Sequence, residues 1–314
     1  MKKRVGLLLK TVFGLGLLFY LVFFVAEPAR IVEILKSSSL PLAALALSLN
    51  LVGLAISALR WKLLLDEQGK AFSLSFLFGS YLVGTFFNHF LPTRFGGDLV
   101  RVNDTRAVPG GLAGAAGVVA AERMSGILAL LVFALVAALA RISFISSIPV
   151  IWVALAVSLA GILTVTALWL FIPPGFFAAR RPASALLQKI CRHIDSFHLT
   201  IQHLMVKKTV LAKLMLGAFL LQLNVIIHYY FIGRAIGLSA IPFSDYFFTI
   251  PILIFVLSIP LSINGIGVRD LTLLQMMAIY GYSPAHAITF SFLDFSFNLL
   301  LGLVGGLVYL LRKK

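Results

Sequence analysis

Residues 90–101 read FLPTRFGGDLVR and residues 258–269 read SIPLSINGIGVR, and these two stretches decide the fold. Each contains Pro, four residues, Gly, two residues and then Val-Arg, with Gly96 or Asn264 just before the shared Gly. Proline removes a backbone donor and glycine frees the backbone, so each stretch is expected to interrupt a helix. Inside a membrane, such an interruption persists only where it is buried in protein or lines a wet cavity.

The chain around these stretches has the composition of an integral membrane protein. Apolar types make up 61% of the 314 residues, mean hydropathy is +1.04, and only 12% of residues are charged. Soluble domains carry about 25% charged residues. Apolar runs of about 20 residues suit a hydrocarbon core of about 30 Å and are too long for barrel strands. We therefore predict an all-α, polytopic integral membrane protein.

The positions of the basic residues are explained better by membrane orientation than by nucleic-acid binding. The formal net charge is +15, and the Lys and Arg residues lie between apolar runs, where they suit an anionic inner leaflet. Cys191 is the only cysteine, so an intrachain disulfide is excluded. Lys2-Lys3-Arg4 precede an apolar run without a small-residue cleavage site, which indicates a retained first span.

Counting the positive segments limits the topology. The stretch 175–209 is predicted to be a cationic amphipathic helix on the cytoplasmic surface, and cations also place residues 60–70 and both termini on that side. In each half of the chain, three apolar runs then separate two cytoplasmic segments, which three full crossings cannot satisfy. The long apolar runs are about 5–26, 40–59, 72–92, 111–140, 148–172, 210–233, 241–263 and 284–311.

If 72–107 and 241–281 are re-entrant hairpins, each half of the chain has two full crossings between its cytoplasmic segments. The prediction is then a single transmembrane domain of about six full spans and two hairpins, with repeats 5–140 and 148–311 in inverted topology. We expect it in the cell inner (plasma) membrane with both termini cytoplasmic. A marker fused at residue 108 that reports the outside would refute this arrangement.

Charged residues inside the apolar runs mark candidate sites, because a charge at the bilayer centre costs about 2.5–3.5 kcal/mol on insertion scales. The first group of such residues, within 88–106, lies either in an ordinary cytoplasmic loop or at the tip of a hairpin. At such a tip the Gly96-Gly97 amides, Arg94 and Arg101 would face an anion such as a lipid phosphate, with Asp98 orienting an arginine. The whole group is Asn88, His89, Arg94, Asp98, Arg101, Asp104 and Arg106.

Glu122 and Arg123 point about 100° apart on a helix, so each needs a partner elsewhere, either in a structural pair or in a polar cavity. Asp294 is the expected counter-ion of Arg269 or Arg123. The polar side chains His228, Gln222 and Asn224 are expected to form inter-helix hydrogen bonds. The second hairpin contributes a third group, Ser262, Asn264, Gly265, Gly267, Arg269 and Asp270.

Three stretches carry a family resemblance: LPTRFGGDLVRV at 91–102, AAERMSGILALL at 120–131 and IPLSINGIGVRDLTLL at 259–274. The chain resembles, over about 5–312, the flippase-like integral membrane family named after the transmembrane region of lysylphosphatidylglycerol synthase. Asp270 matches the acid that follows the last arginine in the family, whereas Asn264 replaces a frequent Gly.

The resemblance implies a lipid flippase or flippase-like transporter that acts on a membrane phospholipid or a polyprenyl or glycolipid substrate. In multidomain relatives a separate cytoplasmic domain performs aminoacyl transfer. This chain ends at Lys314, soon after its last predicted span, so that catalytic domain is expected to be absent and the protein is expected not to be an enzyme. The phosphate is expected on Arg94, Arg101, Arg123 and Arg269, balanced by Asp98, Glu122, Asp270 and Asp294.

Other chemistry has little support in the sequence. A P-loop, a nucleophile elbow and an HExxH pattern are all absent, and no cofactor, metal or nucleic acid is expected. Two alternatives stay open: a membrane enzyme or accessory acting on polyprenyl-phosphate-linked sugars through Asp98 with Glu122 or Asp270, and a non-transporting membrane scaffold. The sequence leaves open the lipid, the direction and energy coupling of transport, and the oligomeric state.

Overall fold

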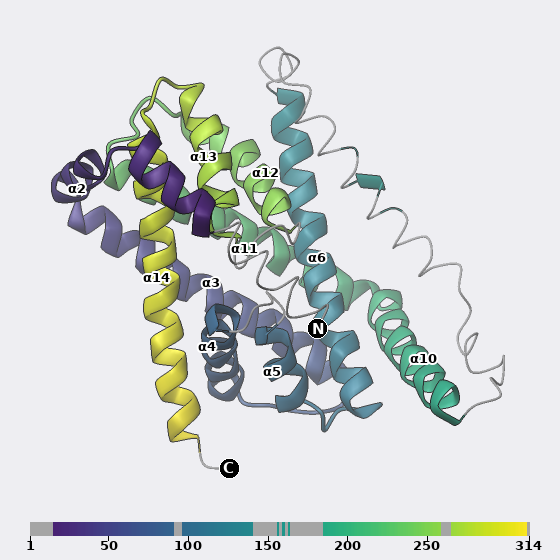
Figure 1. Cartoon of the computed structure of the whole chain (residues 1–314). Helices are drawn as coiled ribbons and strands as arrows, with labels where there is room; N and C mark the ends of the chain where they lie inside the picture. Colours follow the sequence, from purple (N-terminus) through teal and green to yellow (C-terminus); the bar gives the residue numbers. More distant parts are fainter. Residues whose placement is uncertain are drawn as a thin grey trace.

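The computed structural model describes residues 15–90, 96–140, 185–258 and 265–312, with isolated positions between 156 and 163. Every regular element in these ranges is a helix, so the all-α prediction is confirmed for this part of the chain (Figure 1). In chain order the main elements are η1 (Leu21–Val25), α2 (Pro28–Ser37), α3 (Leu40–Glu67), α4 (Leu74–Phe90), α5 (Gly96–Asp104), α6 (Gly111–Ala140), α10 (Ala185–Val206), α11 (Lys208–Ala235), η2 (Phe243–Asp245), α12 (Tyr246–Ser258), α13 (Val268–Ala278) and α14 (Pro284–Leu311).

Four of the described helices are long and apolar enough to cross a membrane: α3, α6, α11 and α14. Residues Leu15–Val25 and α2 would make a fifth span, although they meet at a bend of 84°. Leucines such as Leu307 and Leu310 stay exposed on α14, as lipid-facing side chains do. The chain is therefore a multi-pass membrane protein. The predicted span 148–172 lies almost wholly outside the described residues, as does the first part of 5–26.

Helices α3 and α11 form an antiparallel pair along their whole length. The Ser39 amide donates a hydrogen bond to the Ala235 carbonyl at one end (2.8 Å), and Lys207 Nζ pairs with Glu67 at the other (2.8 Å). Halfway along, a Cβ on Gly53 would lie 3.0 Å from the Asn224 amide oxygen. These contacts make α3 and α11 a frame against which the shorter helices pack.

Helices α4 and α5 form an antiparallel hairpin beside α14. Their backbones approach so closely that a Cβ on Gly84 would lie 3.1 Å from the Gly97 Cα. At the open end, Asp104 accepts hydrogen bonds from Ser80 Oγ (2.6 Å) and Arg312 Nη1 (2.7 Å). Both ends of the hairpin therefore lie at the C-terminal end of α14 (Figure 1).

Helices α12 and α13 form a second hairpin at the other end of α14. The Tyr280 hydroxyl donates to Asp245 (2.8 Å), which joins the start of α12 to the end of α13. The Ala240 amide donates to the Tyr282 hydroxyl (2.7 Å), two residues before α14 begins at Pro284. The two hairpins thus open at opposite ends of the same long helix, as Figure 1 shows.

Two details differ from the sequence predictions. The run 40–59 was expected to end before cytoplasmic cations, but α3 continues to Glu67 and buries Arg60. The amphipathic helix expected in 175–209 spans Ala185–Val206 and packs on α6, where a Cβ on Gly117 would touch Thr200 at 2.9 Å. Its buried face includes Asp195 and His198, and Ile194 of the predicted apolar stripe is exposed, because α6 contacts one flank of that stripe.

Candidate functional site

Glu122 of α6 is the centre of a buried charged network, here called the α5–α6 cluster. Its side chain is 5% exposed and accepts a hydrogen bond from the Tyr81 hydroxyl (2.5 Å). It forms an ion pair with Arg101 of α5 and lies 3.6 Å from Arg60 of α3. The cluster consists of Arg60, Tyr81, Asp98, Arg101, Glu122 and Arg123.

Arg101 is held on every side by α3, α4 and α6. Its guanidinium carbon lies 4.5 Å from the Trp61 ring centroid and 4.1 Å from that of Tyr81, in the corner that these two perpendicular rings form. Asp98, three residues earlier on α5, lies 3.5 Å away. These contacts make Arg101 a rigid part of the network.

Arg123 is the accessible member of the cluster. Its Nε lies 2.6 Å from Asp98 Oδ2, and its side chain is 42% exposed, against 6% for Arg101. Glu122 and Arg123 have separate partners, as expected, and both partners, Arg101 and Asp98, lie on α5.

Arg60 is a site residue that the sequence reasoning missed. Its Nη2 donates to the Glu122 carbonyl and to Ser125 Oγ, both at 2.8 Å. A Cβ on Gly217 would lie 2.7 Å from Arg60 Cγ, so glycine on α11 makes room for this side chain. In the sequence, Gly217 is the one sign of this site, but only the pairing of α3 with α11 in the fold connects Gly217 with Arg60.

Asp294 of α14 is the centre of a second network, here called the α13–α14 cluster, which consists of His228, Arg269, Asp270, Asp294 and Asn298. Arg269 Nη1 donates to Asp294 Oδ2 (2.9 Å), which confirms one of the two expected counter-ion pairings. Asn298 donates to Asp294 Oδ1 (3.0 Å), and His228 Nε2 lies 3.5 Å from the same oxygen. The cluster joins the second hairpin to α11 and α14.

Two of the three polar residues of α11, His228 and Gln222, form the predicted inter-helix hydrogen bonds. His228 Nδ1 lies 2.7 Å from the Ala46 carbonyl of α3, and Gln222 donates to the Gly126 carbonyl of α6 (3.1 Å). Both bonds hold α11 against neighbouring helices.

The Gly97 amide does not have the role expected of it, and the Gly267 amide is also engaged within its hairpin. The Gly97 amide, expected to face an anion, donates to Asn88 Oδ1 (2.7 Å), and Gly97 packs on Gly84. The Gly267 amide donates to Asp270 Oδ2 (2.9 Å), which caps α13. These donors are engaged within the hairpins because a buried helix start needs its own acceptors.

The remaining predicted residues are placed as follows. Gly96 begins α5 and is buried. Gly265 and Gly267 have φ of +78° and +80°, a backbone conformation that favours glycine, so they shape the turn into α13. Arg94, Ser262 and Asn264 lie outside the described residues.

The two hairpins approach α14 at adjacent residues near its middle. The His89 ring, at the inner end of α4, lies 5.7 Å from the Phe295 ring, and Arg269 of α13 binds Asp294. Arg101 and Arg269 each have their own carboxylate partners, so the hairpins bring two charged clusters to the protein interior. Of the four arginines expected on the phosphate, Arg101 and Arg123 thus lie in the first cluster and Arg269 in the second.

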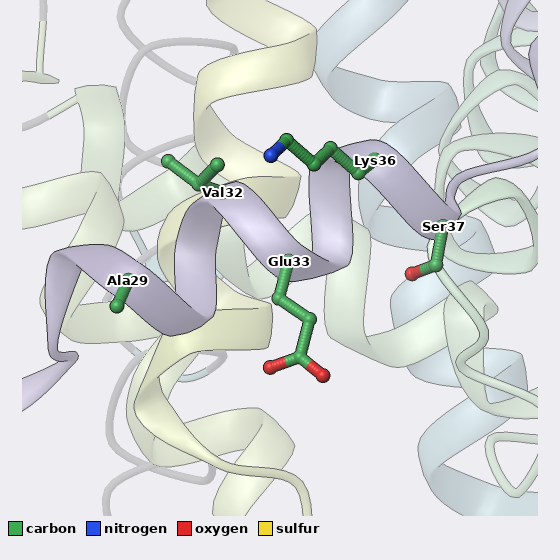
Figure 2. A pocket seen from close by; sticks show the side chains of 5 residues that line it. All are labelled: Ala29, Val32, Glu33, Lys36 and Ser37. Carbon is green, nitrogen blue, oxygen red and sulfur yellow. The ribbon is translucent and has the colours of Figure 1, made fainter.

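A surface hollow of about 470 Å³ lies elsewhere, against α2 (Figure 2). Ala29, Val32, Glu33, Lys36 and Ser37 line it, all from this one short helix. It shares no residue with either cluster. The charged clusters therefore remain the candidate site.

Comparison with known proteins identifies one family. The family described as "Lysylphosphatidylglycerol synthase TM region" matches residues 7–306. No curated protein and no solved structure gives a significant match.

Proposed function

The chain belongs to the family of the lysylphosphatidylglycerol synthase TM region, and from this membership and the two clusters we propose that it is a lipid flippase or flippase-like transporter. Its substrate is a phosphate-bearing membrane lipid that moves between leaflets. The protein lies in the cell inner membrane with both termini cytoplasmic. The family assignment supports a lipid-related membrane role, and the clusters supply the chemistry of the headgroup site.

The observation that carries the proposal is the charge of the α5–α6 cluster. Among its residues, three arginines (Arg60, Arg101, Arg123) face two carboxylates (Asp98, Glu122), which leaves a net charge of +1. A cluster with more arginines than carboxylates attracts an anion. A lipid phosphate is the anion that reaches this depth with its tails still in hydrocarbon.

The three arginines differ in exposure, and this difference suggests a different role for each. Arg60 and Arg101 are 4% and 6% exposed and hold Glu122, so they position the network. Arg123 is the arginine that meets the phosphate, because its side chain is 42% exposed and is the most accessible of the three. Guanidinium groups bind phosphate oxygens through paired, charge-assisted hydrogen bonds. A bound phosphate would thus replace Asp98 as the partner of Arg123.

The arrangement of the hairpins supports a transport path. We take α4–α5 and α12–α13 to be re-entrant hairpins of an inverted repeat, because they open at opposite ends of α14 and approach its middle. Inverted repeats with broken helices place the substrate site near the midplane and expose it to each side in turn. The headgroup passes the charged clusters while the acyl chains remain in the bilayer.

Leaflet exchange of fluorescent phosphatidylglycerol in reconstituted vesicles tests the proposal. Arg123→Gln should lower the exchange rate by about ten- to a hundredfold, since a hydrogen bond to a charged group contributes about 1.5–3 kcal/mol. Arg269→Ala should abolish exchange by freeing α13 from Asp294. Arg234→Gln is the matched control, because Arg234 is exposed in the last turn of α11.

Protein folding is checked by size-exclusion elution and thermal unfolding of each variant. Unchanged exchange in both folded Arg123→Gln and Arg269→Ala would reject the headgroup site. Loss of stability without a specific lipid defect would favour the scaffold alternative. Mass spectrometry of the vesicle lipids separates the enzyme alternative, because an enzyme changes the mass of its lipid and a flippase changes only its leaflet.

A further inference from the structure

His228 is a buried histidine with both ring nitrogens engaged. Its side chain is 7% exposed, in the second half of α11, where it contacts α3 and α14. Nδ1 lies 2.7 Å from the Ala46 carbonyl oxygen, and Nε2 lies 3.5 Å from Asp294 Oδ1. The Phe297 ring lies 6.3 Å from the imidazole, which helps to close the site.

Counting hydrogens shows what this geometry requires. A carbonyl oxygen only accepts, so Nδ1 must carry a hydrogen, and a neutral ring then has a lone pair on Nε2. That lone pair would face a carboxylate oxygen. Asp294 already accepts hydrogen bonds from Arg269 on Oδ2 and from Asn298 on Oδ1, which is the pattern of an ionised carboxylate. An imidazolium would place a donor hydrogen on Nε2 instead of that lone pair, which fits this geometry.

The local charges lead to the same assignment. Arg269 supplies one positive charge against the two buried carboxylates Asp270 and Asp294, and a protonated His228 brings the set from −1 to zero. Tyr229 of the same helix also hydrogen-bonds Asp294 and adds no charge. Groups facing His228 come from α3 as the Ala46 carbonyl and from α14 as Asp294, whose other oxygen binds Arg269 of α13. Buried charges are tolerated when they are paired and balanced.

We propose that His228 and Asp294 together form a proton-binding site, and that its proton controls the second hairpin during transport. The second part rests on the proposed function, and the first part does not. With the proton present, Asp294 joins α11 to α14 and holds Arg269 of α13. When the proton leaves Nε2, a lone pair faces the carboxylate and the His228 contact between α11 and α14 is lost, while Tyr229 still binds Asp294. The hairpin α12–α13 is then freer to move.

The proton site is tested by nuclear magnetic resonance on the full chain in lipid nanodiscs. Ile227-His228 is the only Ile-His dipeptide in the sequence, so ¹³C-isoleucine and ¹⁵N-histidine labelling assigns this ring without a substitution. Near neutral pH, wild type should show both ring nitrogens protonated. Asp294→Asn should convert the ring to its neutral form, and His286→Gln, near the start of α14, should leave the signal unchanged. A neutral His228 ring in wild type would overturn the proton site.

Coupling is tested in the vesicle assay with a pH difference across the membrane. Wild-type exchange should change rate when the gradient is imposed, and His228→Gln should remove that response while His286→Gln keeps it. Exchange that ignores the gradient, together with an imidazolium signal, would overturn the coupling and leave the proton site standing. Absence of exchange in wild type would overturn the proposed function and the coupling with it, whereas the resonance data alone decide the proton site.

Discussion

At the scale of single residues, Glu122 is the acid on which the buried ion pairs of the α5–α6 cluster depend. It is the buried acid that faces both Arg60 and Arg101, and the Tyr81 hydroxyl satisfies its remaining oxygen. Removing one partner of a buried ion pair leaves an uncompensated charge, which costs far more than the pair itself contributes. The same substitution on an exposed pair leaves both groups to water. Glu122 can therefore be compared with an exposed glutamate on the same protein.

Glu122→Gln should lower the free energy of unfolding by about 3–5 kcal/mol, because two buried guanidinium groups lose their counter-ion. Glu67→Gln, which breaks the more exposed pair with Lys207, should cost no more than about 1 kcal/mol. Denaturant unfolding in mixed micelles, followed by tryptophan fluorescence, measures both. Equal losses would show that Glu122 is not the electrostatic centre of the network.

Residue types predicted most of the charged candidates but not their partners. Asp98, Arg101, Glu122, Arg269 and Asp294 attract notice because a charge in an apolar run needs a reason. Which acid meets which base depends on helix packing across long sequence distances, and Asp294 could equally have met Arg123. Position within a run also misled. Arg60, at the end of an apolar run, looks like an interfacial anchor, and the packing of α3 against α6 and α11 buries it.

At the scale of elements, glycines set how closely α4 approaches α14. A Cβ on Gly305 would collide with the Leu82 carbonyl oxygen, and a Cβ on Gly306 would lie 2.8 Å from the Phe86 ring. Small residues at such crossings let backbones meet in membranes, where no hydrophobic force draws helices together. The first hairpin is thus held to α14 by shape as well as by the Asp104–Arg312 ion pair.

Gly305→Ala should lower the free energy of unfolding by about 1–3 kcal/mol, since the added methyl group overpacks a rigid backbone contact. Gly126→Ala is the matched control: the nearest neighbouring atom to its added Cβ would be 3.7 Å away, and alanine favours a helix by about 1 kcal/mol over glycine. The midpoint of thermal unfolding should therefore fall for Gly305→Ala and hold or rise for Gly126→Ala. A tolerated Gly305→Ala would contradict the close crossing.

Hydropathy predicted the elements best where a helix is apolar throughout. The runs 111–140 and 284–311 correspond to α6 and α14 at both ends. Hydropathy gave the wrong helix end where polar residues continue a helix, as at the end of α3. Hydropathy indicates which residues lie in the membrane, and a helix can extend beyond them. On α10 the apolar stripe was seen, but neighbouring helices decide which flank is buried.

At the scale of the whole molecule, the paired motifs and the count of cytoplasmic segments predicted two hairpins. Local patterns could not predict what those hairpins contact, since residues more than 200 positions apart meet at the Asp104–Arg312 pair. The antiparallel pairing of α3 with α11 was also invisible to periodicity, although it brings Ala46 and His228 together. Orientation in a membrane remains a prediction, and it has a direct test.

Cysteine labelling would decide that orientation. In a Cys191→Ser background, which removes the only cysteine, Lys70→Cys and Arg106→Cys are exposed positions at the two ends of the first hairpin. Both should react with a membrane-impermeant thiol reagent from the cytoplasmic side, because a re-entrant hairpin returns to the face that it entered. Ser239→Cys and Ile279→Cys flank the second hairpin and should react only from the opposite side. Labelling of Arg106→Cys and Lys70→Cys from different sides would make 72–107 a full crossing. The two halves of the chain would then lose their inverted relation, and the headgroup path between opposed hairpins would have no structural basis.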